Sequence, residues 1–167
     1  AASAAYTRQI KYWVDVFQGK QPPRQAKSEG DYEACSMAYH WVQSGMESVF
    51  FQDGNSLLMP PDQLTDVLEY LNAAFPQIQR ITTYARSDTI NRLKPERLQR
   101  YAQLKLNRFH IGLETGNDEI LKRMRKGVTK QAQIEAGIKA KAAGIEINEF
   151  YMPGMGGREY ARQSALD

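Results

Sequence analysis

The chain has 167 residues, of which 42% are apolar and 25% charged, with a formal net charge of +3 and one cysteine. These proportions are typical of a soluble globular protein that can bury a core, and a single cysteine excludes a disulfide framework or a metal site with several thiolates from this chain. The sequence has no apolar run of about 18 residues and no signal-peptide pattern, so we expect a cytoplasmic protein without a membrane partner.

Predicted elements alternate along most of the chain. Residues 1–30 form an irregular lead-in, in which apolar residues at helical spacing predict a short amphipathic segment that ends near Phe17. Asp31 is the predicted N-cap of a helix that stops at Gly45. Further helices are predicted to begin near residues 61, 94, 117, 129 and 159, and strands near residues 48, 80, 108 and 145.

The strand spacing predicts the fold class. A period of about 30 residues is that of a βαβ unit, and such units in succession predict an α/β protein with a parallel sheet. The apolar strands favour burial on both faces of that sheet. A complete (βα)8 barrel needs about 250 residues, so the chain is expected to be a partial barrel or a piece of a larger protein. We interpret residues 1–167 as a single domain, with βα units over 31–160.

Polar and glycine-rich residues follow each predicted strand, where parallel sheets bind ligands. Residues 53–56 could hold an amino-acid-like or phosphate group, or could be a turn in which Asn55 or Ser56 caps a helix. Glu114 could accept hydrogen bonds from a ligand, or could pair with Arg86 of the neighbouring strand end. His110, inside a strand, is predicted to be a packed core residue.

The densest basic cluster is Lys122, Arg123, Arg125 and Lys126. Such a cluster can attract phosphate or nucleic acid. A solvated helix face is the simpler interpretation, and nothing else in the sequence supports a nucleic-acid partner.

Four blocks, residues 50–57, 81–86, 108–129 and 150–157, resemble consecutive blocks of the radical S-adenosylmethionine (SAM) superfamily. The similarity is greatest to the branch of oxygen-independent coproporphyrinogen oxidase, tRNA methylthiotransferases and elongator-type enzymes. The resemblance implies a (βα)6 barrel of the partial TIM type. It also implies a [4Fe–4S] cluster on a Cys-x3-Cys-x2-Cys loop, and SAM as the small-molecule cofactor that is cleaved reductively to a 5′-deoxyadenosyl radical.

The resemblance also implies site residues. The turn 53–56 stands where the family holds the methionine amino group, with one glycine where the family has two. Tyr84 and Arg86 lie near the ribose, Glu114 contacts the ribose or the methionine group, and Lys126 meets the carboxylate. The strand that flanks the adenine matches at Met152 and Gly154. The implied cofactor-binding set is therefore Asp53, Gly54, Asn55, Ser56, Tyr84, Arg86, Glu114, Lys126, Met152 and Gly154.

The chain departs from the family in its cysteines. Cys35 is the single cysteine and lies in a predicted helix, so the cluster loop and the first strand are missing. We expect a piece that begins downstream of the motif, with the upstream segment of the same protein as its partner. The sequence also allows a degenerate relative without the cluster, or a form in which the cluster-binding cysteines are replaced. Two further alternatives are a non-catalytic binding or scaffold domain and an ordinary barrel enzyme. The catalytic residues and the substrate are not assigned.

Overall fold

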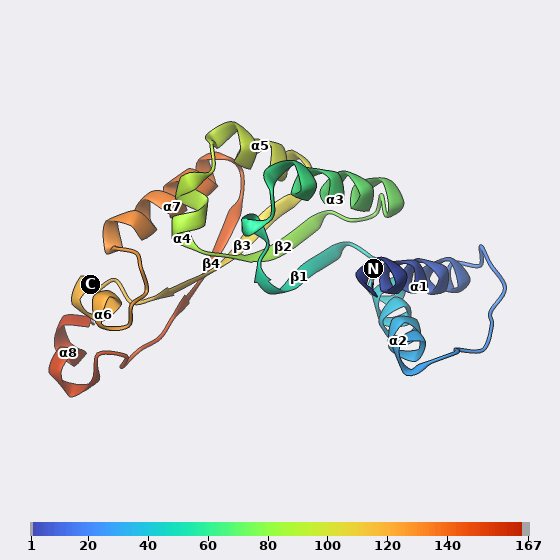
Figure 1. The fold of residues 1–167 in the computed structure, drawn as a ribbon, viewed down its shortest axis with the longest axis horizontal. Helices are drawn as coiled ribbons and strands as arrows, with labels where there is room; N and C mark the ends of the chain where they lie inside the picture. Colours follow the sequence, from blue (N-terminus) through green and yellow to red (C-terminus); the bar gives the residue numbers. More distant parts are fainter. Residues whose placement is uncertain (1, 165–167) are drawn as a thin grey trace. The chain divides into compact units, whose positions relative to one another are not determined.

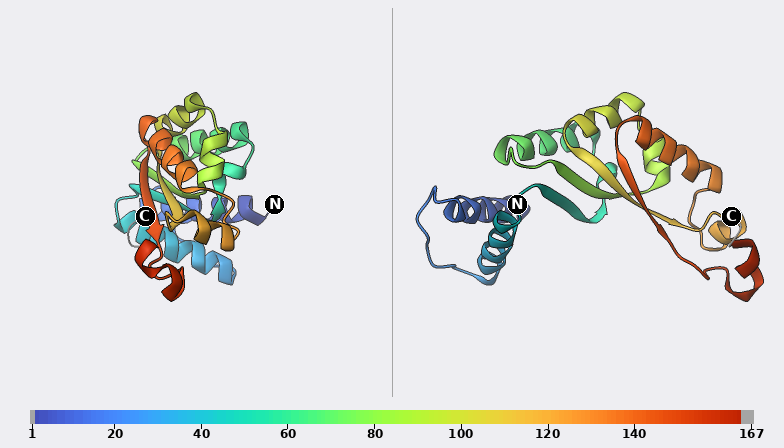
Figure 2. Two further views of the ribbon diagram at one scale, coloured as in Figure 1. Left: turned by 90° about the vertical axis from the view of Figure 1, so that its left-hand side faces the viewer. Right: turned by 180° about the vertical axis from the view of Figure 1, so that it is seen from behind.

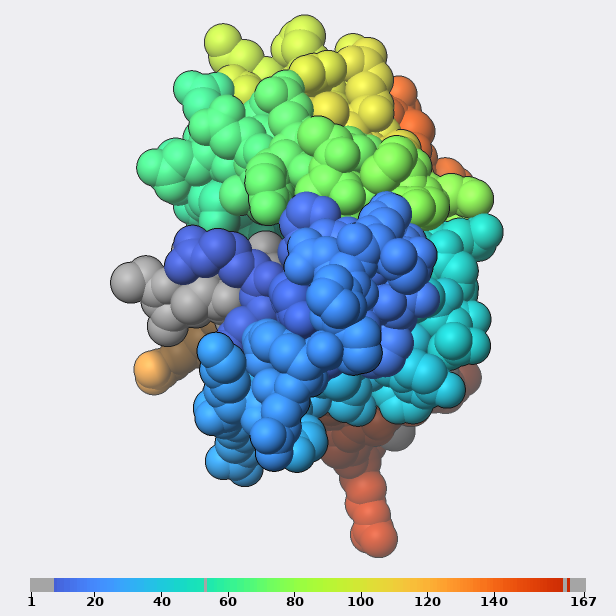
Figure 3. Space-filling view, turned by 90° about the vertical axis from the view of Figure 1, so that its right-hand side faces the viewer, coloured from blue at the N-terminus to red at the C-terminus, as the bar shows by residue number. Residues whose placement is uncertain are grey.

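The computed structural model describes residues 2–164 and contains two compact units that divide between Glu47 and Ser48. The first unit is a helical hairpin of α1 (Ala2–Phe17) and α2 (Glu29–Gln43), which pack against each other. Helix α1 buries Trp13 and Val14, and α2 buries the small residues Ala34 and Ala38. Figure 3 looks onto this hairpin, whose side chains (blue) gather into one packed body.

Asp31 is the polar centre of the hairpin and not its N-cap. The cap of α2 is Ser28, whose side chain accepts a hydrogen bond from the Asp31 backbone N–H. The buried Asp31 carboxylate accepts hydrogen bonds from Trp13 Nε1 and the Lys27 backbone N–H, both at 2.8 Å. The Arg24 guanidinium binds both of its oxygens. The predicted cap is therefore wrong, because partners distant in the sequence recruit this carboxylate.

The second unit is a four-stranded sheet whose strands β1 to β4 are all parallel and lie in chain order, which confirms the predicted α/β class. The strands begin close to their predicted starts, and the sheet is not closed into a barrel. Their bounds are β1 (Ser48–Asn55), β2 (Arg80–Ala85), β3 (Leu106–Glu114) and β4 (Glu146–Tyr151).

Short helices connect the strands. Figure 1 shows α3, α4, α5 and α7 together on one side of the sheet, with α6 and α8 beyond the carboxyl ends of β3 and β4. Helix α4 was not predicted, since its six residues are too few to show a helical period. The elements are η1 (Ser56–Leu58), α3 (Pro61–Ala74), α4 (Ser87–Arg92), α5 (Pro95–Gln103), α6 (Asp118–Arg123), α7 (Lys130–Ala142) and α8 (Gly157–Ser164).

The two faces of the sheet differ in burial. Ile81, Phe109 and Ile111 are buried on the face that the helices cover. On the opposite face Tyr84 is 40% exposed and Phe150 is 46% exposed. The other views show the same one-sided arrangement of the helices (Figure 2). The predicted burial on both faces is thus wrong for the described residues, because their helices cover one side.

Among residues 2–164, no helix combines the length and the apolar character that crossing a membrane requires.

Candidate functional site

The carboxyl ends of β1, β2 and β3 meet at one edge of the sheet because the strands are parallel. At this edge Asn55 pairs with Tyr84, and Tyr84 pairs with His110 of β3. A bulge between Phe51 and Asn55 takes the intervening residues out of the ladder. Bulges of this kind re-aim side chains beside functional sites.

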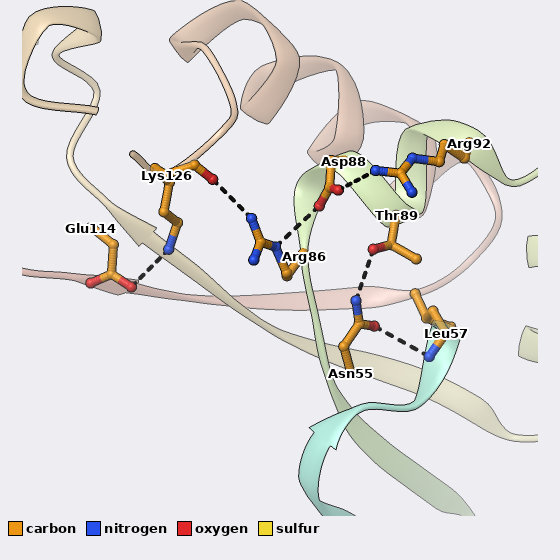
Figure 4. Close-up of polar contacts among 8 residues, drawn as sticks. All are labelled: Asn55, Leu57, Arg86, Asp88, Thr89, Arg92, Glu114 and Lys126. Carbon is orange, nitrogen blue, oxygen red and sulfur yellow. Dashed lines mark hydrogen bonds and ion pairs between the residues drawn. The ribbon is translucent and has the colours of Figure 1, made fainter. Parts of the chain in front are cut away.

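The turn over residues 53–56 is fixed by its own polar contacts. The Asn55 side chain caps η1 by accepting from the Leu57 backbone N–H at 3.2 Å, and it donates to Thr89 at 2.8 Å (Figure 4). Thr83 donates to the Ser56 hydroxyl at 2.8 Å. Gly54 is exposed, with open space where a Cβ would be. The capping interpretation of Asn55 is therefore confirmed, and the exposed backbone at Gly54 is what the turn offers to a ligand. The Asp53 side chain lies outside the described part of the chain.

Glu114 and Lys126 form an ion pair beside this edge. The Lys126 Nζ lies 3.0 Å from Glu114 Oε1, and the two side chains are only 22% and 19% exposed (Figure 4). Glu114 adopts a φ of 66° at a bulge where β3 ends, a conformation that non-glycine residues rarely take. Its backbone carbonyl accepts from the Met152 N–H at 2.9 Å. The ion pair corrects the alternative in which Glu114 pairs with Arg86.

Gly112 makes room for this ion pair. A Cβ built on Gly112 would lie 2.5 Å from Glu114 Oε1 and 3.0 Å from the Lys126 Nζ. A side chain at this position would therefore push the carboxylate and the ammonium off the surface of β3. The glycine lets both charged groups lie over the strand.

The Arg86 side chain contacts the backbone of Lys126. Its guanidinium donates to the Lys126 carbonyl oxygen at 2.8 Å and to Asp88 at 3.2 Å (Figure 4). Asp88 in turn pairs with Arg92 at 2.6 Å. Arg86, Glu114, Lys126 and the Met152 backbone thus form one connected group.

The open face of the sheet carries a ring cluster that the sequence did not reveal. The His110 ring lies 5.2 Å from Phe50, 6.0 Å from Tyr84 and 5.5 Å from Phe150, measured between centroids. The prediction that His110 belongs to the core is wrong, since it is half-buried on the uncovered side of β3. Burial and the nearby Arg108 charge lower the pKa of His110, which favours the neutral imidazole. The alternation of side chains along paired strands was the available signal.

The last predicted residues follow β4. Met152 is 50% exposed. Gly154 has a φ of 82°, and its carbonyl oxygen accepts a hydrogen bond from the Gly157 N–H, which closes a turn. Gly154 therefore suits a conformation that other residues disfavour. The predicted site residues thus fall into a group around Glu114 and a second group around Asn55, with Tyr84 between them in the register of the strands.

The sequence matches the family model described as the Radical SAM superfamily over residues 19–163. The chain belongs to the radical SAM superfamily. No curated protein matches the sequence. The predicted superfamily is confirmed, and the particular branch within it stays a prediction.

The solved structures that share the fold of this radical SAM chain include two with a TM-score of at least 0.60. Both are of the cobalamin-dependent S-adenosylmethionine radical enzyme OxsB, one with aqua-cobalamin and S-adenosylmethionine bound and one with aqua-cobalamin bound. Their TM-scores are 0.61 and 0.60 at 20% sequence identity. The match covers 80% of this chain and 20% of the OxsB chain, so the radical SAM chain spans about a fifth of that enzyme.

The residues of this chain do not fit the iron–sulfur cluster that the radical SAM family implies. Such clusters are held by several cysteine thiolates, and the sequence has one cysteine. Cys35 lies in α2, where burial, and then the Asp31 charge, raise the pKa of its thiol. Within the described residues, no three His, Cys, Asp or Glu side chains are grouped to hold a metal ion.

We therefore expect no stoichiometric [4Fe–4S] cluster when this radical SAM chain alone is reconstituted with iron and sulfide. One thiol that is protonated by burial is a poor ligand. Iron and acid-labile sulfide per chain are the measurement, and Cys35→Ser is the matched control, with the same low content. About four irons per chain, lost in the control, would contradict this prediction.

Proposed function

We propose that residues 48–164 are the part of a radical SAM enzyme core that binds S-adenosylmethionine at the carboxyl ends of β1 to β4. In this proposal the Glu114–Lys126 pair holds the methionine group. The observation that carries it is the partly buried ion pair, 3.0 Å between Nζ and Oε1, at the strand-end edge where parallel folds bind ligands.

The charge pattern of the pair is complementary to an amino acid. The methionine group of SAM carries an ammonium and a carboxylate close together. Glu114 can accept from the ammonium, and Lys126 can donate to the carboxylate, through charge-assisted hydrogen bonds. Because both side chains are about four-fifths buried, these bonds are less screened by water than bonds at an exposed surface.

The remaining residues of the proposed site lie at or just after the carboxyl ends of the strands of the same sheet. Gly54, within the turn that also contains Asp53, Asn55 and Ser56, offers exposed backbone groups to the cofactor. Tyr84 is 40% exposed and lies where the family places the ribose. Met152 and Gly154 flank the adenine in the same scheme.

The proposed role of this chain is to bind and orient SAM. Reductive cleavage of SAM needs the cluster thiolates, which this chain does not supply, so they belong to another segment. Such a segment, a cytoplasmic location and a substrate chosen elsewhere in the protein are further parts of the proposal.

Calorimetric titration with SAM tests the proposal. The wild type should saturate, and Glu114→Gln or Lys126→Met should weaken binding by about 10- to 100-fold, the usual effect of losing a hydrogen bond to a charged group. Decarboxylated SAM separates the two roles. Lys126→Met should lose little affinity for it, because the carboxylate that Lys126 binds is absent, whereas Glu114→Gln should still weaken it.

Glu119→Gln and Lys122→Met are the matched controls, since they remove the same charges from exposed positions on α6. Both should bind SAM as the wild type does. The proposal fails if the wild type shows no saturation at millimolar SAM, or if the control variants weaken binding as much as the site variants do.

A second candidate function is a non-catalytic SAM-binding or scaffold domain, which the single cysteine favours. The encoding gene separates the two candidates. An in-frame Cys-x3-Cys-x2-Cys motif upstream supports the enzyme core, whereas its absence supports the binding domain.

A further inference from the structure

Lys126 lies in the short segment between two helices. The segment joins α6, which ends at Arg123, to α7, which begins at Lys130. Arg125 and Gly127, on either side of Lys126, have φ values of 54° and 78°. The conformation of Arg125 is that of a helix end, since its N–H donates to the Lys122 carbonyl and the Lys126 N–H donates to the Leu121 carbonyl, both at 3.0 Å, and Gly127 takes a positive φ without strain.

Arg86 adds a contact to this segment from the end of β2. Its terminal nitrogen donates to the Lys126 carbonyl oxygen at 2.8 Å, while its Nε donates to Asp88 at 3.2 Å. One guanidinium thus joins the end of β2 to the segment after α6.

These contacts fix where the Lys126 side chain starts, and Gly112 leaves space where it ends. With the backbone held by Arg86, the ammonium reaches Glu114 across a strand position without a Cβ. The Arg86 donors that bind the carbonyl and Asp88 are committed to the protein, so they are not directed at a ligand.

We propose that Arg86 is a positioning residue that places the Lys126 ammonium against Glu114, and that it affects the cofactor through Lys126. The ligand part of this inference rests on the proposed SAM site. The fork of the guanidinium is what allows two partners at once. A lysine at this position could reach one of them with a point charge.

Binding measurements in a double-mutant cycle test this role. Arg86→Ala should weaken SAM binding by about fivefold to tenfold, less than Lys126→Met does. The double variant should bind within about twofold of Lys126→Met alone, because residues that act through one another are not additive. Losses that multiply in the double variant would show that Arg86 binds the cofactor directly and would overturn the proposal, as would an Arg86→Ala variant with wild-type affinity.

Arg92→Ala is the matched control, because Arg92 also pairs with Asp88 but does not contact Lys126 in the structure. It should leave SAM binding unchanged. Arg86→Lys should recover part of the loss, since it restores one donor. An Arg92→Ala variant as weak as Arg86→Ala would mean that the Asp88 ion pairs, and not the Lys126 carbonyl, carry the effect.

A measurement without SAM separates this inference from the proposed function. The lysine ammonium signals of ¹⁵N-labelled protein, with Lys126 assigned by its loss in Lys126→Met, report the ion pair directly. Arg86→Ala should weaken the Lys126 signal by faster exchange, and Arg92→Ala should not. An unchanged signal in Arg86→Ala refutes the positioning role, whereas absent SAM binding by the wild type refutes only the proposed function.

Discussion

Replacing Phe109 by alanine is expected to lower the free energy of unfolding of the second unit by about 3–5 kcal/mol. Phe109 is fully buried in the middle of β3, between Thr83 of β2 and Ile147 of β4, on the face that the helices cover. Removing the ring leaves a cavity that its neighbours on β2 and β4 fill only in part. Urea unfolding followed by far-ultraviolet circular dichroism measures the effect.

Phe150→Ala is the matched control for this prediction. Phe150 is the same residue type on the open face, 46% exposed, with an edge contact to His110. Its loss should cost only about 1 kcal/mol, the value of an aromatic pair. Equal costs for the two variants would mean that the helices do not cover the Phe109 face.

Asp31→Asn is expected to destabilise the helical hairpin markedly at neutral pH. The Arg24 guanidinium, hydrogen-bonded to both carboxylate oxygens, lowers the pKa of Asp31 well below its usual range. The amide of asparagine removes the charge and directs its own N–H groups at donors from Trp13, Arg24 or Lys27. The fluorescence of Trp13 and Trp41, the two tryptophans of the sequence, follows this unit during thermal unfolding.

The lowered pKa of Asp31 also predicts how the stability of the hairpin changes with pH. Because the pKa is lower in the folded state than the unfolded value of about 3.9, the ionised carboxylate stabilises the hairpin fully above about pH 5. That contribution is lost progressively as the pH falls below about 4, so wild type and Asp31→Asn should converge in acid. Asp15→Asn, which removes a carboxylate paired with Lys11 in the same unit, is the control and should change little. Parallel melting curves for Asp31→Asn and wild type at every pH would contradict the assignment.

The sequence predicted the layout of the second unit because strand and helix signals are local. Apolar runs near residues 48 and 80 and the proline at position 61 mark elements without reference to distant residues. The same locality explains the match of residues 108–129 to the radical SAM pattern. The interpretation of residues 1–167 as one domain stays a prediction.

The errors concern side chains whose partners are distant in the sequence. Ser28 and Asp31 are both cap-forming residues three positions apart, and only the tertiary contacts to Trp13 and Arg24 decide between them. Glu114 pairs with Lys126 and not with Arg86, although Arg86 ends the neighbouring strand.

Strand register accounts for the wrong expectation that both faces of the sheet are buried. Phe50, His110 and Phe150 belong to apolar strands, and composition gives no sign of which face is covered. The register places these rings together on the uncovered side. Predicting the cluster from sequence would require both the strand pairing and the side on which the helices lie.

The order of the strands in the sheet also bears on how the chain reaches its fold. Ser48 pairs with Arg80, Ile81 with Leu106, and Arg108 with Glu146, so each pairing closes the one connection between consecutive strands. The entropy of closing such loops grows only slowly with their length. During synthesis each strand emerges directly after the neighbour on which it docks, and the sheet can grow from β1 to β4 in the order of translation.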